Sequence, residues 1–360
     1  MTTKNILPVD EMIEAGRAWR LMSVLLSGFA VLNILSVQLP HERYIRYQQF
    51  DYSDLFKLRW VYERIHDDPT PIDVAIIGSS RVEAALSAPE LAAALGKRLD
   101  RPIHVANLAV PYEGRNLHYI IVKELLESHP ETRLILISVV ERADISHPAF
   151  RYVADTRDIL DAPLMISHYY AEDAAYLPYR QMSYFVQSIV PSWFGKSLVM
   201  RKDYLGTDFD STKSFRIPRG RLIDRGLVAP MQKLKNEAAE LKAGLGNTDG
   251  YWVQPSAWYT LNEPLEPEYT ARIAALAKQH GAFVVFVHLP FYSSRPWQYD
   301  HAAYERLGPL LDAQQFSDDA QFYADGGHFN RFGIEKISPW IASAIDPYLD
   351  SLRSSNISPR

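Results

Sequence analysis

The sequence predicts an α/β domain built on a doubly wound parallel sheet and preceded by one membrane-spanning helix. Three observations lead to this prediction. Apolar, β-branched runs alternate with helical segments of about ten to fifteen residues. One short polar motif follows a predicted strand near the start of the domain, and a second precedes a predicted helix near its end. A run without charged residues, from Leu21 to Leu39, precedes the domain.

The charge-free run predicts an anchor. At 1.5 Å per residue a helix over Leu21 to Leu39 is about 28 Å long, close to the hydrocarbon thickness of a bilayer. No small-x-small cleavage site follows it, which favours an uncleaved anchor over a signal peptide. A buried helix is the third interpretation. Lys4, Arg17 and Arg20 precede the run, which favours an N-terminus inside the cell.

The first predicted strand, Asp73 to Ile77, ends abruptly at Gly78. Ser79 and Ser80 come next, and the following residues have a helical composition as far as Gly96, the expected helix stop. A serine on a strand-to-helix turn lies at the carboxyl edge of a parallel sheet, near the positive end of a helix dipole. Ser80 is therefore the candidate nucleophile.

The second motif lies far downstream, in Tyr323 to Gly333. Asp325 and His328 are three residues apart, just before the predicted last helix. A serine nucleophile needs a base to take its proton, and the base needs an acceptor that fixes its tautomer. Asp325 and His328 could supply both from one loop. Asn330 is expected to cap the last helix.

Further strands and helices lie between the motifs. The predicted strands are 103–109, 133–140 and 282–290, and the predicted helices are 118–129, 269–281 and 333–349. This alternation implies a parallel sheet. It is lost between about 150 and 265, which we interpret as an insertion that governs substrate choice. Within it, Phe185 to Phe194 is apolar enough to dock on a bilayer or a membrane protein, or to form satellite core.

These assignments divide the chain into segments. They are a tail (1–20), the anchor (21–39), a connector (40–70), the α/β domain with its insertion (71–350) and a second tail (351–360). The connector could lie along a membrane surface or simply join anchor to domain.

Composition excludes several functions. The net charge of −5 argues against a nucleic-acid partner, and the absence of cysteine excludes disulfides and thiolate zinc sites. No HExxH, EF-hand, Walker A or GxGxxG motif is present, so neither a metal nor a cofactor is expected. His147 and His288 follow or end predicted strands, and we expect them to be packed or solvent-facing rather than to line a site.

The two motifs resemble the first and last blocks of the SGNH/GDSL hydrolase superfamily. Gly78-Ser79-Ser80 stands where that superfamily has Gly-Asp-Ser, so the nucleophile corresponds to Ser80, and Asp325-Gly326-Gly327-His328 corresponds to the last block. The closer resemblance is to the membrane-anchored branch of DltD-like D-alanyl transfer proteins and polysaccharide O-acyltransferase proteins. It covers about residues 70–145 and 265–345.

The resemblance implies a flavodoxin-like SGNH fold and an oxyanion hole. Gly114, after the second strand, would donate a backbone N–H beside that of Ser80. The superfamily's asparagine after the third strand is missing, and Glu141-Arg142 resembles the pair found there in alginate-type acetyltransferase relatives. Arg142 or Arg81 could replace the asparagine electrostatically. Alternatively, Arg142 forms a surface pair with Glu141 or Asp144.

The resemblance also implies a function. Ser80 would carry the acyl group, with His328 as base and Asp325 as its partner. A membrane-bound O-acyltransferase (MBOAT) protein would deliver the acyl group, and a cell-envelope polysaccharide or teichoic-type polymer would accept it. The domain would lie in the periplasm, anchored to the bacterial inner membrane. A free-standing carbohydrate esterase or deacetylase and a non-catalytic assembly component are the alternatives.

Overall fold

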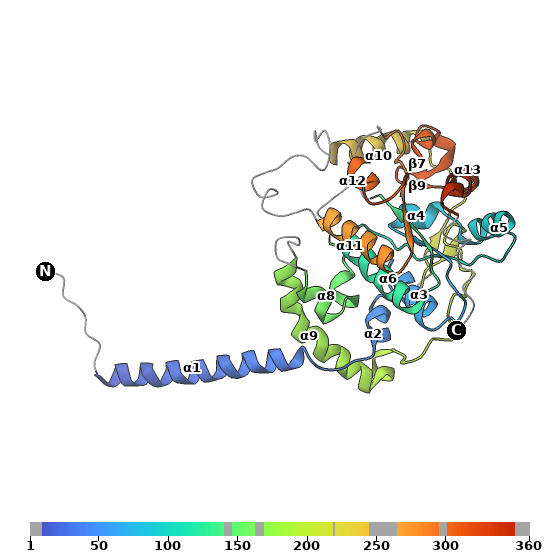
Figure 1. Cartoon of the computed structure of the whole chain (residues 1–360). Helices are drawn as coiled ribbons and strands as arrows, with labels where there is room; N and C mark the ends of the chain where they lie inside the picture. The colour runs from blue at the N-terminus through green and yellow to red at the C-terminus, as the bar shows by residue number, and fades with distance from the viewer. Residues whose placement is uncertain are drawn as a thin grey trace.

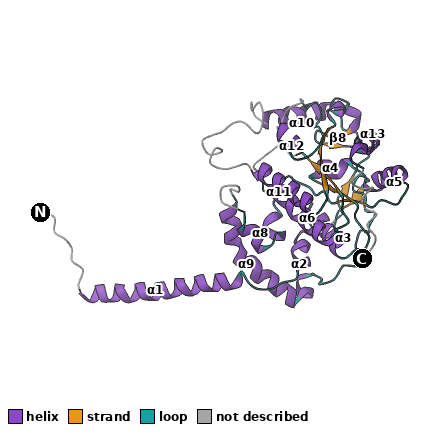
Figure 2. Cartoon of the chain, in the orientation of Figure 1, coloured by secondary structure: helices purple, strands orange, loops and turns teal. Residues whose placement is uncertain are grey.

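A computed structural model describes residues 9–139, 146–162, 169–218, 220–244, 265–294 and 301–349. Helix α1 (Val9–Ser36) projects away from an α/β domain whose strands lie among the helices (Figures 1 and 2). Its segment Trp19–Ser36 is long and apolar enough to cross a membrane and is almost fully exposed. Its length and composition are those of a membrane span or of a signal sequence.

The domain is organised around a parallel sheet. The strands are β1 (Val74–Ile77), β2 (Val105–Asn107), β3 (Leu134–Ser138), β6 (Phe283–His288) and β7 (Leu310–Asp312). They pair in parallel in the order β2-β1-β3-β6-β7. The predicted parallel sheet is therefore confirmed. Strands β2 and β3 lie on opposite sides of β1, so the direction in which strands are added to the sheet reverses there. Open α/β sheets bind ligands at the carboxyl ends of the strands that flank such a point.

Helices cover both faces of this sheet. Successive residues of β1 face opposite layers, so Ala75 and Ile77 lie in one core cluster and Val74 and Ile76 in the other. The first cluster includes residues of α3 (Lys57–His66), α6 (Arg115–Ser128) and α11 (Leu265–Gln279). The second includes residues of α4 (Ser80–Ala85), α5 (Ala88–Leu99) and α13 (Arg331–Ala344). This arrangement is the doubly wound architecture expected from the sequence.

The helix expected to run from the serine turn to Gly96 is in fact two helices, α4 and α5. The break follows from Ser87, whose hydroxyl accepts a hydrogen bond from the N–H of Glu90 and so caps a new helix, and from Pro89 in its first turn. Gly96 does not stop α5. The helix ends at Leu99, because Asp100 adopts the left-handed conformation.

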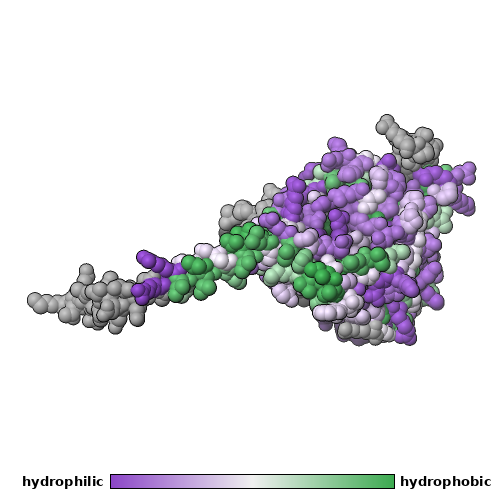
Figure 3. Space-filling model, turned by 90° about the horizontal axis from the view of Figure 1, so that it is seen from below, coloured by the Kyte–Doolittle hydropathy of each residue, from purple (hydrophilic) through white to green (hydrophobic). Residues whose placement is uncertain are grey.

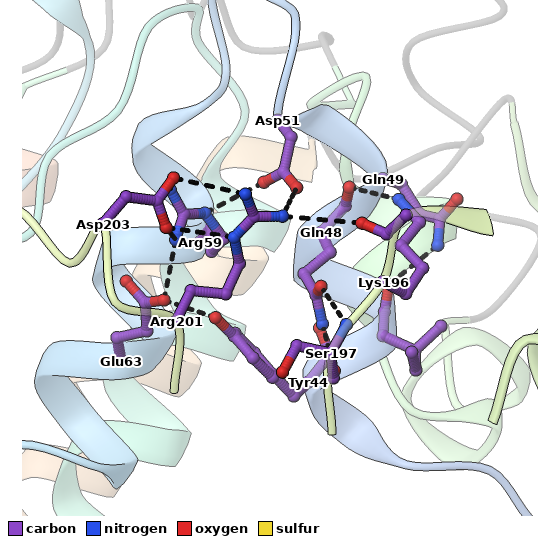
Figure 4. Close-up of polar contacts among 12 residues, drawn as sticks. Tyr44, Gln48, Gln49, Asp51, Arg59, Glu63, Lys196, Ser197, Arg201 and Asp203 are labelled. Carbon is purple, nitrogen blue, oxygen red and sulfur yellow. Dashed lines mark hydrogen bonds and ion pairs between the residues drawn. The ribbon is translucent and has the colours of Figure 1, made fainter. Parts of the chain in front are cut away.

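The segment after α1 belongs to the folded domain. It forms α2 (Arg43–Tyr47), the 3₁₀ helix η1 (Gln48–Phe50) and α3, and Tyr47 and Trp60 are buried in the core. Figure 4 shows the polar contacts that hold it: Arg59 pairs with Asp51 at 3.0 Å and with Asp203 at 3.0 Å. The structure therefore makes this connector part of the folded domain.

The described chain between β3 and β6 adds no strand to the central sheet. It forms α7 (Phe150–Val153), α8 (Thr156–Leu160), α9 (Tyr170–Ile189), η2 (Pro191–Phe194), the hairpin of β4 (Phe215–Arg216) and β5 (Leu222–Ile223), and α10 (Met231–Gly244). After β6 come α12 (His301–Glu305), η3 (Gln314–Phe316), η4 (Ala320–Phe322), the hairpin of β8 (Tyr323–Asp325) and β9 (His328–Phe329), and, beyond α13, η5 (Asp346–Tyr348).

Candidate active site

The turn after β1 positions two serines in different ways. Gly78 has φ +155°, and a Cβ added there would lie 2.3 Å from the Ser138 Oγ on the adjacent strand β3, so only glycine fits. Ser79 is extended and buried, and Ser80 is the half-buried first residue of α4. The strand-to-helix turn predicted from the sequence is therefore present, with Ser80 at its helical side.

The loop between β8 and β9 is a tight polar turn. The Asp325 Oδ1 accepts hydrogen bonds from the backbone N–H groups of Gly327 and His328, both at 2.9 Å. The N–H of Gly326 donates to the Glu237 carboxylate of α10 at 2.6 Å. Asn330 caps α13 by accepting from the N–H groups of its first turn, as predicted. The turn is therefore held by its own backbone, by α10 and by the start of α13.

Ser80, His328 and Asp325 form a continuous chain of hydrogen bonds. The His328 Nε2 lies 2.8 Å from the Ser80 Oγ, and its Nδ1 lies 2.8 Å from the Asp325 Oδ1. Since a carboxylate only accepts, Nδ1 carries the proton shared with Asp325, which leaves Nε2 free to accept from the serine hydroxyl. The fold thus brings together residues 248 positions apart in the sequence.

The Asp325 carboxylate is ionised at neutral pH. Burial raises its pKa, but the hydrogen bond and charge of His328 and the backbone N–H groups of Gly327 and His328 outweigh burial and lower the pKa to about 2. The Asp325 carboxylate therefore stays a hydrogen-bond acceptor for the His328 Nδ1 throughout the neutral range.

The three residues face a cavity of about 780 Å³. Its apolar and aromatic lining comes mainly from the β4–β5 hairpin and its neighbours: Phe56, Tyr112, Phe215, Ile217, Leu222, Ile223, Leu227 and Phe291. Its charged lining consists of Asp54, Arg81, Glu83, Glu113, Arg221, Asp224, Arg225, Lys233 and Asp325. A cavity of this size, with an apolar wall and converging polar groups, is typical of a small-molecule or chain-end binding site.

Arg81 lines this cavity but is engaged by the surrounding structure. Its Nη1 donates to the carbonyl of Leu289 at 2.8 Å, its Nη2 lies 3.7 Å from Glu113, and its guanidinium lies 4.2 Å from the centre of the Phe291 ring. The side chain thus braces the serine helix against the loop after β6. Its charge reaches the cavity, while its contacts are those of a structural support.

Gly114 does not line the cavity, although Tyr112 and Glu113 do. It is the buried residue at the start of α6, with φ +144°, and a Cβ added there would lie 2.3 Å from the backbone nitrogen of His147. Close packing against His147 therefore accounts for the glycine. Arg142, with Glu141 and Asp144, lies outside the described residues.

His147 and His288 are packed side chains. The His147 Nε2 lies 2.8 Å from the carbonyl of Pro111 and its Nδ1 accepts from the N–H of Ala149. Burial lowers the pKa of His147 to about 4, so its ring is neutral. The His288 Nδ1 pairs with the Asp312 carboxylate at 2.7 Å, and neither histidine lines the cavity.

Arg225 is a cavity residue that sequence reasoning missed. Its Nε donates to the carbonyl of Ser211 at 3.1 Å, and its Nη groups have no hydrogen-bond partner among the described residues. The pKa of Arg225 is below its ordinary value, because the lowering by burial outweighs the raising by the nearby Glu83 and Asp325 carboxylates. Arg221 pairs with Asp54 and Lys233 with Glu237. Of these three cations, only Arg225 forms no ion pair with an acidic side chain among the residues that the structure describes.

A buried ion pair lies beneath the serine helix. The Lys57 Nζ lies 3.5 Å from the Glu83 carboxylate, one helical turn after Ser80, and also donates to the carbonyl of Ala109 at 2.7 Å. Burial lowers the pKa of Lys57 to about 8, although Glu83 raises it, so the Lys57 ammonium is protonated at neutral pH. This pair ties α4 to α3.

The parts of the chain that the structure describes contain no cluster of three or more side chains suited to hold a metal ion. The chain matches no protein-family model and no curated protein. The chemistry of the site is therefore argued from its own geometry.

Proposed function

We propose that this chain is a serine-dependent acyl-transfer enzyme of the SGNH type, held at a membrane by α1. The observation that carries the proposal is the hydrogen-bonded series Ser80, His328 and Asp325 at the edge of a cavity. Such a series makes a serine hydroxyl nucleophilic at neutral pH, because the imidazole can take its proton as the new bond forms.

In the first half-reaction the Ser80 Oγ attacks the carbonyl carbon of an acyl ester or thioester. Its proton passes to the His328 Nε2, and Asp325 stabilises the resulting imidazolium through Nδ1. The tetrahedral intermediate then collapses, the bond to the leaving oxygen or sulfur breaks, and the leaving group takes the proton from Nε2. The product is an ester on Ser80.

In the second half-reaction an acceptor hydroxyl loses its proton to the His328 Nε2 and attacks the acyl group on Ser80. The new ester forms as the bond to the Ser80 Oγ breaks, and the Oγ takes the proton back from Nε2. Water as the acceptor gives hydrolysis by the same route. Neither half-reaction requires a metal or a redox cofactor.

Two groups would stabilise the oxyanion of each intermediate. The backbone N–H of Ser80 is at the first position of α4, where helix geometry leaves an N–H without an intrahelical acceptor. Arg225 brings Nη donors to the same cavity, and we assign to it the electrostatic role that the sequence suggested for Arg142 or Arg81.

The SGNH assignment is supported by the strand order and by the position of both motifs. The Gly78-Ser79-Ser80 turn follows the strand at which the sheet order reverses, and the Asp325–His328 turn precedes the last long helix, as in the resemblance described above. On this assignment the chain between β3 and β6 is an insertion. An MBOAT protein would supply the acyl group, and an envelope polysaccharide or teichoic-type polymer would accept it in the periplasm.

Intact-mass measurement after treatment with a fluorophosphonate tests the proposed nucleophile. The full chain in detergent is expected to gain one adduct, which Ser80→Ala abolishes and His328→Ala slows strongly. Ser79→Ala is the matched control, because its hydroxyl is one residue away, buried and outside the hydrogen-bonded series. An adduct that persists in Ser80→Ala, or no adduct on the wild-type chain, would overturn the proposal.

A free-standing esterase is the second candidate, favoured by the openness of the same site to water. Ser80 is half-buried and both it and His328 line the cavity. Steady hydrolysis of simple aryl esters by the purified chain, without any partner, would support the esterase. An acyl-Ser80 adduct that persists until a polyol or sugar is added would support transfer.

A further inference from the structure

Helix α9 exposes an apolar face. Tyr179, Met182, Val186 and Ile189 are 61%, 46%, 45% and 61% exposed. Their spacing of three, four and three residues places them on one side of the helix. The opposite side is turned inward and is largely polar: Asp173, Arg180, Gln181 and Gln187 are buried there against the domain, together with Leu177 and Tyr184. A surface helix of a soluble domain has the reverse pattern.

The chain after α9 extends this face. Trp193 is 83% exposed, Val199 is 71% exposed, and Phe194, Leu198 and Met200 are exposed as well. We refer to the following exposed residues as the apolar strip: Tyr179, Met182, Val186, Ile189, Trp193, Phe194, Leu198, Val199 and Met200. The charged residues between Tyr179 and Met200 are Arg180, which is buried, and Lys196, which is half-buried. Contiguous apolar surface of this kind marks an interaction site.

The strip begins where α1 leaves the domain. The apolar segment of α1 ends at Ser36, and the carbonyl of the next residue, Val37, accepts a hydrogen bond from Gln181 of α9 at 3.0 Å. The N–H of Glu42 donates to Ser188 of the same helix at 3.0 Å. If α1 spans a bilayer, these contacts hold α9 at the level of the bilayer surface. In Figure 3 the hydrophobic surface of α1 is followed by further hydrophobic surface on the adjoining face of the domain.

We propose that the apolar strip docks on the lipid bilayer that α1 crosses. Aromatic side chains such as Tyr179 and Trp193 suit the headgroup region, where an apolar ring can keep its polar atom hydrated. Whenever α1 is inserted in a bilayer, the lipid surface lies next to α9. The strip then gives the domain a second membrane contact, which adds to the anchor and fixes the face of the domain turned to the bilayer. This proposal is independent of the enzymatic one.

Site-directed labelling of the full chain tests the proposal, and the absence of native cysteine allows one label at a time. A fluorophore is attached at Trp193→Cys or Val199→Cys, and the chain is reconstituted in nanodiscs of phosphatidylethanolamine and phosphatidylglycerol. Nitroxide-bearing lipids are then added. Lys97→Cys is the control, because it is exposed on α5, which Figure 1 places on the side of the domain away from α1.

We expect nitroxide lipids to quench the label at positions 193 and 199 severalfold more than the label at position 97. Docked side chains would lie about 5–10 Å into the boundary between headgroups and acyl chains. A second variant keeps the test decisive: with the label at Val186→Cys, adding Trp193→Asp and Val199→Asp is expected to remove most of the quenching. Equal quenching at positions 193, 199 and 97 in lipid alone would overturn the proposal.

Discussion

Glu237 of α10 accepts a hydrogen bond from the backbone N–H of Gly326 at 2.6 Å. Gly326 lies inside the turn that carries Asp325 and His328, so a helix from the region between β3 and β6 holds the polar turn of the site. Lys233, which lies 3.6 Å from the Glu237 carboxylate, also lines the cavity. That region is thus coupled both to the shape of the cavity and to the position of the proposed base.

Replacing Glu237 with alanine is expected to slow the modification of Ser80 by a fluorophosphonate about 10- to 100-fold, because a displacement of about 1 Å in a catalytic group has an effect of that size. The free energy of unfolding should fall by only about 1 kcal/mol, since Glu237 is partly exposed. Glu240→Ala on the exposed side of the same helix is the control. Equal rates for the two variants would show that the hydrogen bond does not position the turn.

Replacing Arg225 with glutamine is expected to reduce the rate of Ser80 acylation about 10²–10³-fold, the usual loss when one oxyanion donor is removed. Arg225→Lys should recover part of the rate, because it restores the charge but not the two Nη donors. Arg216→Gln is a matched control: Arg216 lies on the same hairpin region but outside the cavity lining. The measurement is the single-turnover rate with an activated acyl ester. A wild-type rate in Arg225→Gln would contradict the assigned role.

Breaking the buried pair under the serine helix is expected to destabilise the domain. The side chains of Lys57 and Glu83 are 1% and 4% exposed, so Glu83→Leu leaves a buried ammonium unpaired and should lower the free energy of unfolding by about 3–5 kcal/mol. The double variant Lys57→Met with Glu83→Leu should regain much of this loss, since no unpaired charge remains. Urea unfolding of the two variants checks the prediction, and a double variant as unstable as the single one would contradict it.

The stability of the domain should fall in mild acid because of His147. The pKa of His147 in the folded protein, about 4, is below the ordinary histidine value of 6.5, so the unfolded chain binds more protons between these two pH values. The contribution of His147 is therefore fully present above about pH 6.5 and is lost progressively as the pH falls toward 4. The loss is up to about 1.4 kcal/mol per pH unit. His147→Gln should give a shallower dependence of unfolding free energy on pH over this window, and an unchanged slope would rule out His147 as its source.

Much of the fold could be predicted because its signals are local. The strand Val74–Ile77 is apolar on both faces and ends at a glycine, and Asn330 stands directly before the helix that it caps. Other boundaries depended on competing local signals: Ser87 and Pro89 begin a new helix inside a run that has a continuous helical composition. Strand β7 is three residues long and half-buried, so it has no continuous apolar run to reveal it.

By itself, the sequence determined the strand-to-helix serine turn, the Asp-x-x-His loop and the apolar N-terminal helix, because each depends on residues within a few positions of one another. Only the tertiary structure decided that His328 reaches Ser80, that Glu237 holds the loop, and that Arg225 rather than Gly114 faces the cavity. These contacts join residues from 89 to 248 positions apart. Such contacts depend on how the whole chain folds and not on a local sequence pattern, so no motif predicts them.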